Sequence, residues 1–313
     1  MKIMVTGGAG FIASHVSEGY LRAGHTVVIV DDLSTGKREN VPQGARFYQC
    51  DITDQEAVER IVAEERPEII NHHAAQMDVR RSVREPMFDA RVNIVGALGL
   101  LEIAVKHKVR KVLYASTGGA SYGEVSTVPV NESHPAAPIC HYGVSKLTFE
   151  RYLFLYRYLY GLNYTVMRYP NVYGPRQNPR GEAGVVAIFA LQMLRGDQPT
   201  IFGDGSKTRD YVFVEDIVKA NALLLEKGDG EILNLGTGTP TSDYDIFELV
   251  RAAASYEGEP RYAPNRPGEV PQIALDAHKV QAISGWVAET PLKEGIARTV
   301  DFIRQSNACF TNP

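Results

Sequence analysis

The chain has 313 residues, a formal net charge of −4 and a hydrophobic content of 44%. This length supports a large apolar core, and we expect one principal domain with a smaller second lobe. The slight negative charge provides no basic field for nucleic acid, and no run of about 18 apolar residues predicts a membrane span.

Neither a secretory signal nor a metal site is predicted. The sequence enters an apolar run directly, without the charged and apolar regions of a secretory signal. Cys50, Cys140 and Cys309 lie far apart and lack the spacing of metal ligands, as do the histidines. We therefore expect a cytoplasmic protein with no metal.

A strand, a glycine-rich turn and a helix open the chain. Residues 3–5 form a short apolar run, and residues 11–23 have the apolar spacing of a helix. Gly7 permits the turn, Gly10 allows close approach of the backbone, and Ala13 is small enough for helix–strand packing. Because a helix N-terminus behind such a turn binds phosphates, we predict a dinucleotide pyrophosphate site.

An acidic residue about twenty positions later completes this pattern. Residues 26–30 form a second apolar run that ends in Asp31 and Asp32. A carboxylate here accepts hydrogen bonds from the adenosine ribose and repels a 2′-phosphate, which favours NAD as the cofactor. We expect Asp31 to hold the ribose, while Asp32 is either a second ligand or a solvated turn residue. Lys37 and Arg38 follow closely and leave NADP as an alternative.

Strands and helices continue to alternate through the first half of the chain. This pattern predicts an α/β fold of the Rossmann type, a doubly wound parallel sheet with helices on both faces. After Tyr169 turns become frequent, which indicates a smaller C-terminal α/β substrate lobe. We expect residues 1–170 to bind NAD, with later segments returning to that domain, and residues 171–313 to form mainly the substrate lobe. Further strands are expected at 46–50, 68–71, 111–115 and 163–168, and helices at 55–65, 87–107 and 141–160.

Tyr142 and Lys146 are the central catalytic candidates. They lie four residues apart on a predicted helix and therefore share one face. The cationic amine, together with a positive nicotinamide ring, favours phenolate and lowers the phenol pKa, so that Tyr142 can act as a base. In this interpretation Lys146 also holds the nicotinamide ribose.

The strand at 111–115 leads into two further candidates, Ser116 and Thr117. Ligands of open parallel sheets bind at the carboxyl ends of strands, where either hydroxyl can bond the reacting oxygen. We expect Thr117 to be the catalytic hydroxyl and Ser116 to have a secondary role, although either can be an ordinary turn hydroxyl.

Several further motifs extend over nearly the whole chain. They are Asp51-Ile52, His73-Ala74-Ala75, Arg168-Tyr169-Pro170-Asn171-Val172, Arg209-Asp210-Tyr211-Val212 and Arg266-Pro267-Gly268-Glu269. With the glycine turn and the pair Tyr142 and Lys146, they resemble the extended short-chain dehydrogenase/reductases, in particular the UDP-glucose 4-epimerase group.

The resemblance implies how NAD is bound. Asp51 and Ile52 bracket the adenine in such proteins. The turn at Ala74 and Ala75 runs beside the pyrophosphate, and Asn93 helps to order the site. The implied cofactor-binding residues are Gly7, Gly10, Phe11, Ile12, Asp31, Asp32, Leu33, Ser34, Thr35, Gly36, Asp51, Ile52, His73, Ala74, Ala75, Gln76, Asn93, Ala115, Ser116, Tyr142, Lys146, Tyr169, Asn171 and Val172.

The resemblance also implies a UDP-sugar substrate. Arg209 and Arg266 pair with its diphosphate, which suits the bidentate grip of guanidinium on phosphate oxygens. Glu269 holds the ribose on the uridine side, and Ile273 lies where a bulky aromatic side chain restricts the sugar pocket. The implied substrate-binding residues are Thr117, Gly118, Tyr142, Asn171, Val186, Thr200, Phe202, Arg209, Arg266, Glu269 and Ile273.

The implied reaction is a 4-epimerisation in which NAD stays bound. Tyr142 removes the proton of the 4-hydroxyl while NAD takes hydride from C4; the 4-keto sugar then turns and is reduced on its other face. No acid follows Thr117 until Glu124, which argues against dehydratase and decarboxylase relatives. Open alternatives are a 4-epimerase of UDP-N-acetylhexosamine or UDP-glucuronate, a reductase that releases its cofactor, and a catalytically silent NAD-binding sensor or scaffold.

The predicted helices at 87–107 and 141–160 carry more apolar surface than one sheet face needs. Similar proteins pair these helices in a four-helix dimer interface, so the resemblance implies a homodimer. The alternative is that both helices pack on the chain's own sheet. The residues behind this expectation include Tyr152, Leu155, Tyr156 and Leu159.

Overall fold

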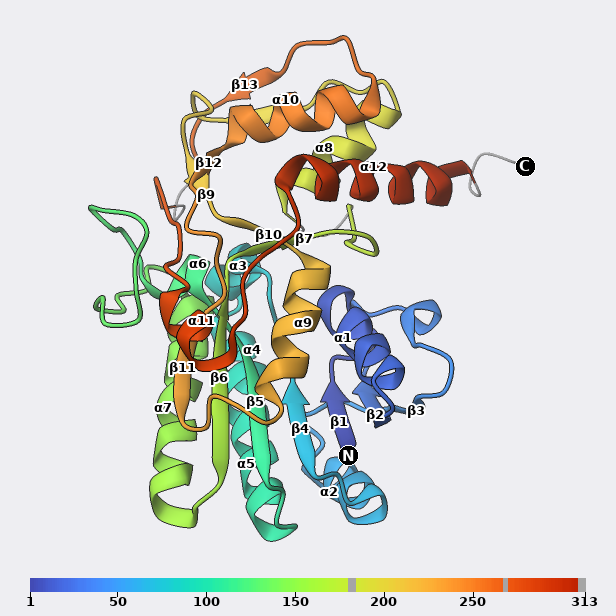
Figure 1. The fold of residues 1–313 in the computed structure, drawn as a ribbon, viewed down its shortest axis with the longest axis vertical. Helices are drawn as coiled ribbons and strands as arrows, with labels where there is room; N and C mark the ends of the chain where they lie inside the picture. Colours follow the sequence, from blue (N-terminus) through green and yellow to red (C-terminus); the bar gives the residue numbers. More distant parts are fainter. Residues whose placement is uncertain (180–183, 267–269, 309–313) are drawn as a thin grey trace.

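A seven-stranded parallel sheet forms the centre of the computed structural model, which describes residues 1–179, 184–266 and 270–308 (Figure 1). Its strands are β1 (Lys2–Thr6), β2 (Thr26–Asp31), β3 (Arg46–Gln49), β4 (Ile69–His72), β5 (Lys111–Thr117), β6 (Asn163–Tyr169) and β11 (Glu231–Asn234). They lie in the order β11-β6-β5-β4-β1-β2-β3, and every neighbouring pair is parallel. This order confirms the predicted doubly wound sheet of the Rossmann type.

Helices cover both faces of the sheet (Figure 1). They are α1 (Phe11–Arg22), α2 (Gln55–Glu65), α5 (Ala97–Lys106), α7 (His141–Tyr160) and α9 (Val214–Leu224). Successive strand residues point to opposite faces, so Ile3 and Val5 share a core with α1 and α9, while Met4 shares one with α2, α5 and α7. Because both faces are buried, the strands appear in the sequence as continuous apolar runs.

The long helix predicted at residues 87–107 contains a π-helical turn. It consists of α4 (Pro86–Ala90), the turn η2 (Arg91–Gly96) and α5. Pro86 begins α4 at a position where its missing N–H breaks no helical hydrogen bond. π-Turns occur frequently at functional sites, and this one carries Asn93.

Further helices and short strands lie beyond the carboxyl ends of the sheet strands, at the top of Figure 1. The helices are α8 (Val185–Leu194), α10 (Asp243–Ala254) and α12 (Leu292–Ala308). The strand pairs are β7 (Asn171–Tyr173) with β10 (Tyr211–Phe213), β8 (Thr200–Phe202) with β13 (Arg261–Ala263), and β9 (Thr208–Arg209) with β12 (Thr241–Ser242). The strand β11 and the helix α9 come from the second half of the chain but belong to the central sheet and its cover. A division of the chain into two parts at residue 170 stays a prediction.

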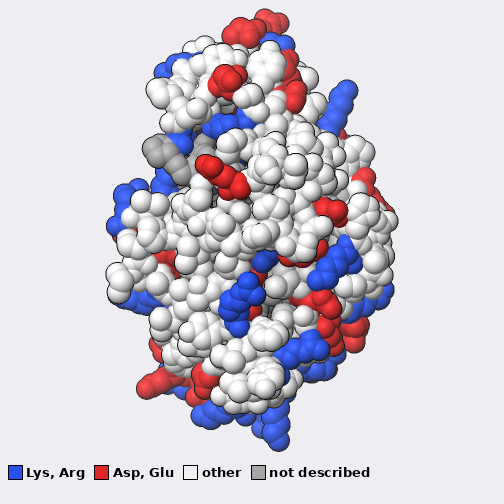
Figure 2. Space-filling model, turned by 90° about the vertical axis from the view of Figure 1, so that its left-hand side faces the viewer, with Lys and Arg blue, Asp and Glu red and all other residues white. Residues whose placement is uncertain are grey.

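The charged side chains of both signs are interspersed on the side of the molecule drawn in Figure 2. Neither sign gathers into a large continuous patch on this face, and uncharged residues make up most of it. Among the residues that the structure describes, no helix is both long and apolar enough to cross a membrane.

The turn between β1 and α1 depends on the absence of a side chain at Gly7. This residue has φ +71, and a Cβ atom added to it would lie 2.7 Å from the backbone nitrogen of Ala74. Its own N–H donates to the carbonyl of Val30 at 2.8 Å. The turn is therefore held between the carboxyl ends of β2 and β4, where no room is left for a methyl group.

Replacement of Gly7 by Ala tests this contact, with Gly24→Ala as the matched control. Gly24 also has positive φ, at +82, but a Cβ atom there would meet nothing within 4 Å. We expect Gly24→Ala to lower the free energy of unfolding by about 1–2 kcal/mol through backbone strain alone. Gly7→Ala adds a clash with backbone and should cost about 1–3 kcal/mol more. Urea unfolding measures both, and equal losses would contradict the close approach.

Candidate active site

The predicted NAD site begins at the turn between β1 and α1. Helix α1 starts after Gly10, which has no capping side chain, so the N–H groups of its first turn are available to phosphate. The buried Asp31 carboxylate lies beside this turn and accepts hydrogen bonds from the N–H groups of Ala9 at 2.9 Å and Leu33 at 2.8 Å. Burial raises the pKa of Asp31, and these hydrogen bonds oppose the rise. Together these groups fit the phosphates and ribose of a dinucleotide.

The neighbouring acid Asp32 has a different environment. Its carboxylate accepts hydrogen bonds from the N–H and the hydroxyl of Ser34, at 2.9 and 2.7 Å, in an exposed turn. Only Asp31 is directed at the glycine turn, which favours it as the ribose ligand. At the end of β3, Asp51 is exposed and Ile52 is buried.

Two histidines lie at the end of β4: His72, its last residue, is buried, and His73, the next residue, is half-buried. His72 Nδ1 lies 2.7 Å from the hydroxyl of Thr6, and His73 Nε2 lies 3.1 Å from the hydroxyl of Tyr169. Burial lowers the pKa of His73 to about 3 and that of His72 well below its usual range. Both rings are therefore neutral near pH 7 and act as hydrogen-bonding groups of the sheet edge.

The loop that carries His73, Ala74 and Ala75 is fastened by the next residue, Gln76. The N–H of Gln76 donates to the side-chain oxygen of Asn93 at 2.9 Å, and the Asn93 amide donates to the carbonyl of Gln76 at 2.8 Å. The π-turn η2 thus connects directly to the loop at the end of β4.

Tyr142 and Lys146 lie on the first turns of α7, against the end of β5. The Lys146 amine is 5.9 Å from the centre of the Tyr142 ring and donates to the carbonyl of Ala115 at 2.9 Å. Burial lowers the pKa of Lys146 to about 8, so the amine is mainly cationic at neutral pH. Burial raises the pKa of the Tyr142 phenol, and Cys140 and Asp89 add to the rise. The expected lowering of this pKa is therefore not found in the protein alone.

The two hydroxyls at the end of β5 have different partners. Ser116 is buried and donates to the Glu150 carboxylate at 2.6 Å. Thr117 is half-buried and accepts the N–H of Ala120 at 3.2 Å, as the cap of the short helix α6 (Gly118–Ser121). A Cβ atom added to Gly119 would lie 3.9 Å from the Thr117 hydroxyl and 3.6 Å from the Asn171 side-chain oxygen. Thr117 and Asn171 therefore lie on the same side of the sheet end.

A buried ion pair lies behind Ser116. The Arg168 guanidinium donates two hydrogen bonds to the Glu150 carboxylate, Nε to Oε1 at 3.0 Å and Nη2 to Oε2 at 2.6 Å. The same guanidinium lies 4.9 Å from the centre of the Tyr122 ring, whose hydroxyl donates to Asn234 at 2.8 Å. This fork geometry connects α7 to β6 and, through Tyr122, to β11.

Two of the predicted substrate residues meet beyond the sheet. The Arg266 guanidinium lies 3.5 Å from the centre of the Phe202 ring. Arg209 is half-buried and donates to the carbonyl of Thr208 at 2.8 Å. Thr200 is engaged by Arg261, at 3.0 and 3.2 Å.

Other predicted substrate residues lie in apolar surroundings or outside the described part of the chain. Val186 belongs to the main core. Ile273 is buried in a small apolar cluster with Tyr122 and Leu275. Glu269 lies outside the described residues.

Asp210 joins the segments that carry these residues. Its buried carboxylate accepts the N–H groups of Thr237, Gly238 and Leu275 at 3.0–3.1 Å. Its carbonyl accepts the N–H of Asn171 at 2.9 Å. Asp210 therefore fixes Arg209, its neighbour in the chain, relative to Asn171 and to the segment that contains Ile273.

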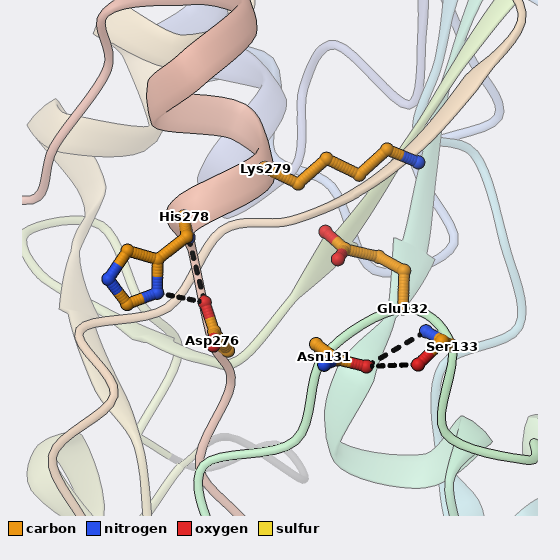
Figure 3. A pocket seen from close by; sticks show the side chains of 6 residues that line it. All are labelled: Asn131, Glu132, Ser133, Asp276, His278 and Lys279. Atoms are coloured by element: carbon orange, nitrogen blue, oxygen red, sulfur yellow. Dashed lines mark hydrogen bonds and ion pairs between the residues drawn. The ribbon is translucent and has the colours of Figure 1, made fainter.

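A polar surface hollow lies elsewhere, between residues 131–133 and the start of α11 (His278–Ser284) (Figure 3). Its side chains already have partners: Asp276 accepts from His278, Asn131 accepts from Ser133, and Lys279 is paired with Glu231. None of the predicted site residues lines it. Among the described residues, no group of three or more His, Cys, Asp or Glu side chains is arranged to hold a metal ion.

The chain belongs to the NAD dependent epimerase/dehydratase family, whose model matches residues 3–236. It is 43% identical to the UDP-glucose 4-epimerase of Mycolicibacterium smegmatis over 313 residues, covering 98% of this chain and 100% of the relative. Among solved structures, the UDP-glucose 4-epimerase of Thermotoga maritima with UDP-glucose superposes with a TM-score of 0.97 at 49% identity, covering 98% of this chain and 100% of that one. The UDP-glucose 4-epimerase of Thermus thermophilus in complex with NAD gives a TM-score of 0.93 at 44% identity, covering 97% and 99%.

Three buried acids of this region were not predicted from the sequence. Glu150 lies four residues after Lys146 on the same helical face, so the spacing of the two residues was a signal that could have identified it. Asp210 belongs to one of the quoted motifs, but no role was expected for it. Asp89 lies outside every motif, and only its surroundings in the fold identify it.

The pair of Glu150 and Arg168 can be tested by a double-variant cycle. Glu150→Leu leaves the Arg168 guanidinium buried without its partner and should lower the free energy of unfolding by about 3–5 kcal/mol. Adding Arg168→Met removes the stranded cation and should recover most of that loss, because an apolar pair tolerates burial. Urea unfolding of the parent, both single variants and the double variant measures the coupling. A double variant less stable than Glu150→Leu would contradict the paired burial.

Proposed function

We propose that the protein is a UDP-glucose 4-epimerase that uses NAD to interconvert UDP-glucose and UDP-galactose. One observation carries the proposal: Lys146 on α7 donates to the carbonyl of Ala115 in β5, with Tyr142 one turn earlier on the same helix and Thr117 two residues further along the strand. The relatives named above support this interpretation, since they match almost the whole chain and are named for this activity.

The cofactor is held, in this proposal, by the first half of the chain. The glycine turn and the α1 N-terminus bind the pyrophosphate, and Asp31 binds the adenosine ribose. When bound, NAD supplies a reversible hydride acceptor for C4 of the sugar. We propose the same division between the two parts of the chain: residues 1–170 for the cofactor and residues 171–313 mainly for the nucleotide sugar.

Tyr142 moves the proton at the 4-hydroxyl oxygen. Its phenol is protonated at neutral pH in the protein alone, because burial raises its pKa, so it needs a cation close by to release the proton. Lys146 provides that cation. Thr117 donates or accepts at the same sugar oxygen, and we assign it the role rather than Ser116, whose hydroxyl is engaged by Glu150.

The nucleotide part of the substrate is held by charge. Arg209 and Arg266 grip the diphosphate and Asn171 touches it, while Glu269 holds the uridine ribose. The sugar itself has few strong partners in this scheme, which leaves it free to present either face of C4. The free thiols of Cys50 and Cys140 suit a reducing compartment, and we place the enzyme in the cytoplasm.

Incubation of the purified protein with UDP-galactose, followed by NMR, tests the activity. We expect UDP-glucose to appear without added NAD if the cofactor is retained, and after NAD is added if it is not. Tyr142→Phe should lower turnover by about 10²–10⁴-fold, because proton transfer is lost, while NAD binding persists. Parallel tubes with UDP-N-acetylgalactosamine and UDP-galacturonate test the alternative sugars. No epimer in any tube, even with NAD, would refute the proposal.

We further propose a homodimer formed through α7 and the helices beside it. Phe154 and Tyr158 lie four residues apart on one face of α7 and are 62% and 80% exposed. Leu155 and Leu159 are also exposed, as expected, but Tyr156 is buried in the chain's own core, where its hydroxyl bonds Glu102. Exposed apolar area of this kind on one helix favours association.

A charge on this face should separate the subunits. We expect light scattering to give a dimer mass for the parent and a monomer mass for the variant Phe154→Glu with Tyr158→Glu, since burying two carboxylates is costly. Tyr262→Glu is the control, because Tyr262 is 52% exposed on β13, remote from α7. A parent that scatters as a monomer would refute the dimer and leave the activity untouched.

A further inference from the structure

Asp89 is a buried acid that the proposed mechanism does not use. It lies on α4 and is 1% exposed. Its Oδ1 atom accepts hydrogen bonds from the side-chain amides of Gln76 at 2.9 Å and Asn93 at 3.1 Å. Both donors are neutral, so these contacts solvate the carboxylate without cancelling its charge.

These two amides connect the cofactor loop to the catalytic helix. Gln76 and Asn93 also bond each other through the backbone of Gln76, at 2.8 and 2.9 Å. The Asn93 amide lies a further 3.3 Å from the hydroxyl of Ser145, the residue next to Lys146. Asp89 orients both NH₂ groups, which leaves the Asn93 oxygen free to accept the N–H of Gln76.

Lys146 needs a nearby negative charge to stay protonated in its buried position. Among the described residues, the ionisable groups that face it are His72 from β4, His73 directly after β4, Tyr114 from β5, Tyr142 and Glu150 from α7, and Asp89 from α4. Burial keeps the histidines and phenols neutral near pH 7. The Glu150 carboxylate is shared with the Arg168 guanidinium.

Asp89 and Glu150 both favour the cation at Lys146, and of these two acids Glu150 is also bonded to a guanidinium. Burial lowers the pKa of Lys146, and Asp89 is the leading influence that raises it again, ahead of Glu150. The same charge adds to the rise of the Tyr142 pKa, so it acts on both members of the catalytic pair.

We propose that Asp89 is a positioning residue of the active site, which fixes the Gln76–Asn93 amide pair and holds Lys146 as a cation. The proposal rests on the proposed function, because it assumes that Tyr142 and Lys146 carry the proton transfer. It assigns Asp89 no contact with substrate or cofactor.

Asp89→Asn isolates the charge, because asparagine keeps the size and one acceptor oxygen. The pKa of Lys146 should fall when the neighbouring charge is lost, so the amine becomes neutral at lower pH. Competitive acetylation, read by mass spectrometry of the Lys146 peptide, measures this in the protein without substrate. The basic limb of the pH dependence of kcat should move to lower pH by a similar amount. The KM for UDP-glucose should stay unchanged.

Glu85→Gln is the matched control. It removes a carboxylate four residues earlier, where Glu85 is exposed and paired with Arg81, and should leave both profiles unchanged.

Asp89→Leu removes acceptor and charge together and should in addition weaken NAD retention, because the loop at Gln76 is released. Thermal unfolding of each variant identifies any that fails to fold.

The outcomes separate the two proposals. If the parent epimerises UDP-galactose but Asp89→Asn leaves the Lys146 acetylation profile and the basic limb in place, the role of Asp89 is refuted and the function stands. If the parent has no epimerase activity while the acetylation profile still shifts in Asp89→Asn, the electrostatic role holds and the proposed function fails.

Discussion

Burial of charge around α7 is the constraint on which the rest of the site depends. Asp89, Lys146, Glu150 and Arg168, two acids and two bases, are each at most 3% exposed. An uncompensated ion in such surroundings costs several kcal/mol, so each needs an opposite charge or hydrogen-bond partners in good geometry. Because these partners come from α4, α7 and β6, balancing the charges also fixes the three elements relative to one another.

The alternation of side chains along β5 decides whether the hydroxyl of Ser116 or that of Thr117 is available to a ligand. Tyr114 and Ser116 point to the face covered by α7, where Tyr114 packs on Phe149 and Ser116 bonds Glu150. Ala115 belongs to the core on the opposite face. Thr117, at the end of the strand, is half-buried and caps α6. A shift of one residue in this strand would exchange these roles and leave Glu150 without its serine.

Local patterns were enough for most of the fold, and long-range contacts explain what they missed. The predicted helices at 55–65 and 141–160 coincide with α2 and α7. The π-turn was not predicted, because apolar spacing looks alike on either side of it. Spacing also predicted that Tyr142 and Lys146 share one helical face, whereas no motif of the sequence includes Asp89. Its partners are Gln76, in the loop after β4, and Asn93, four residues later, and composition and periodicity do not encode how the fold brings these three side chains together.

Burial acts on the catalytic pair in opposite directions, and this sets what the fold must add. Loss of solvent lowers the pKa of Lys146 and raises that of Tyr142, so both groups are pushed towards neutrality. The neutral phenol of Tyr142 can donate a proton. To accept one it must first ionise to phenolate, and a nearby cation favours that ionisation. The acids Asp89 and Glu150 favour that cation, although Asp89 also adds to the rise of the phenol pKa. A site built in this way buries Lys146 and still retains the positive charge of its amine that proton transfer requires.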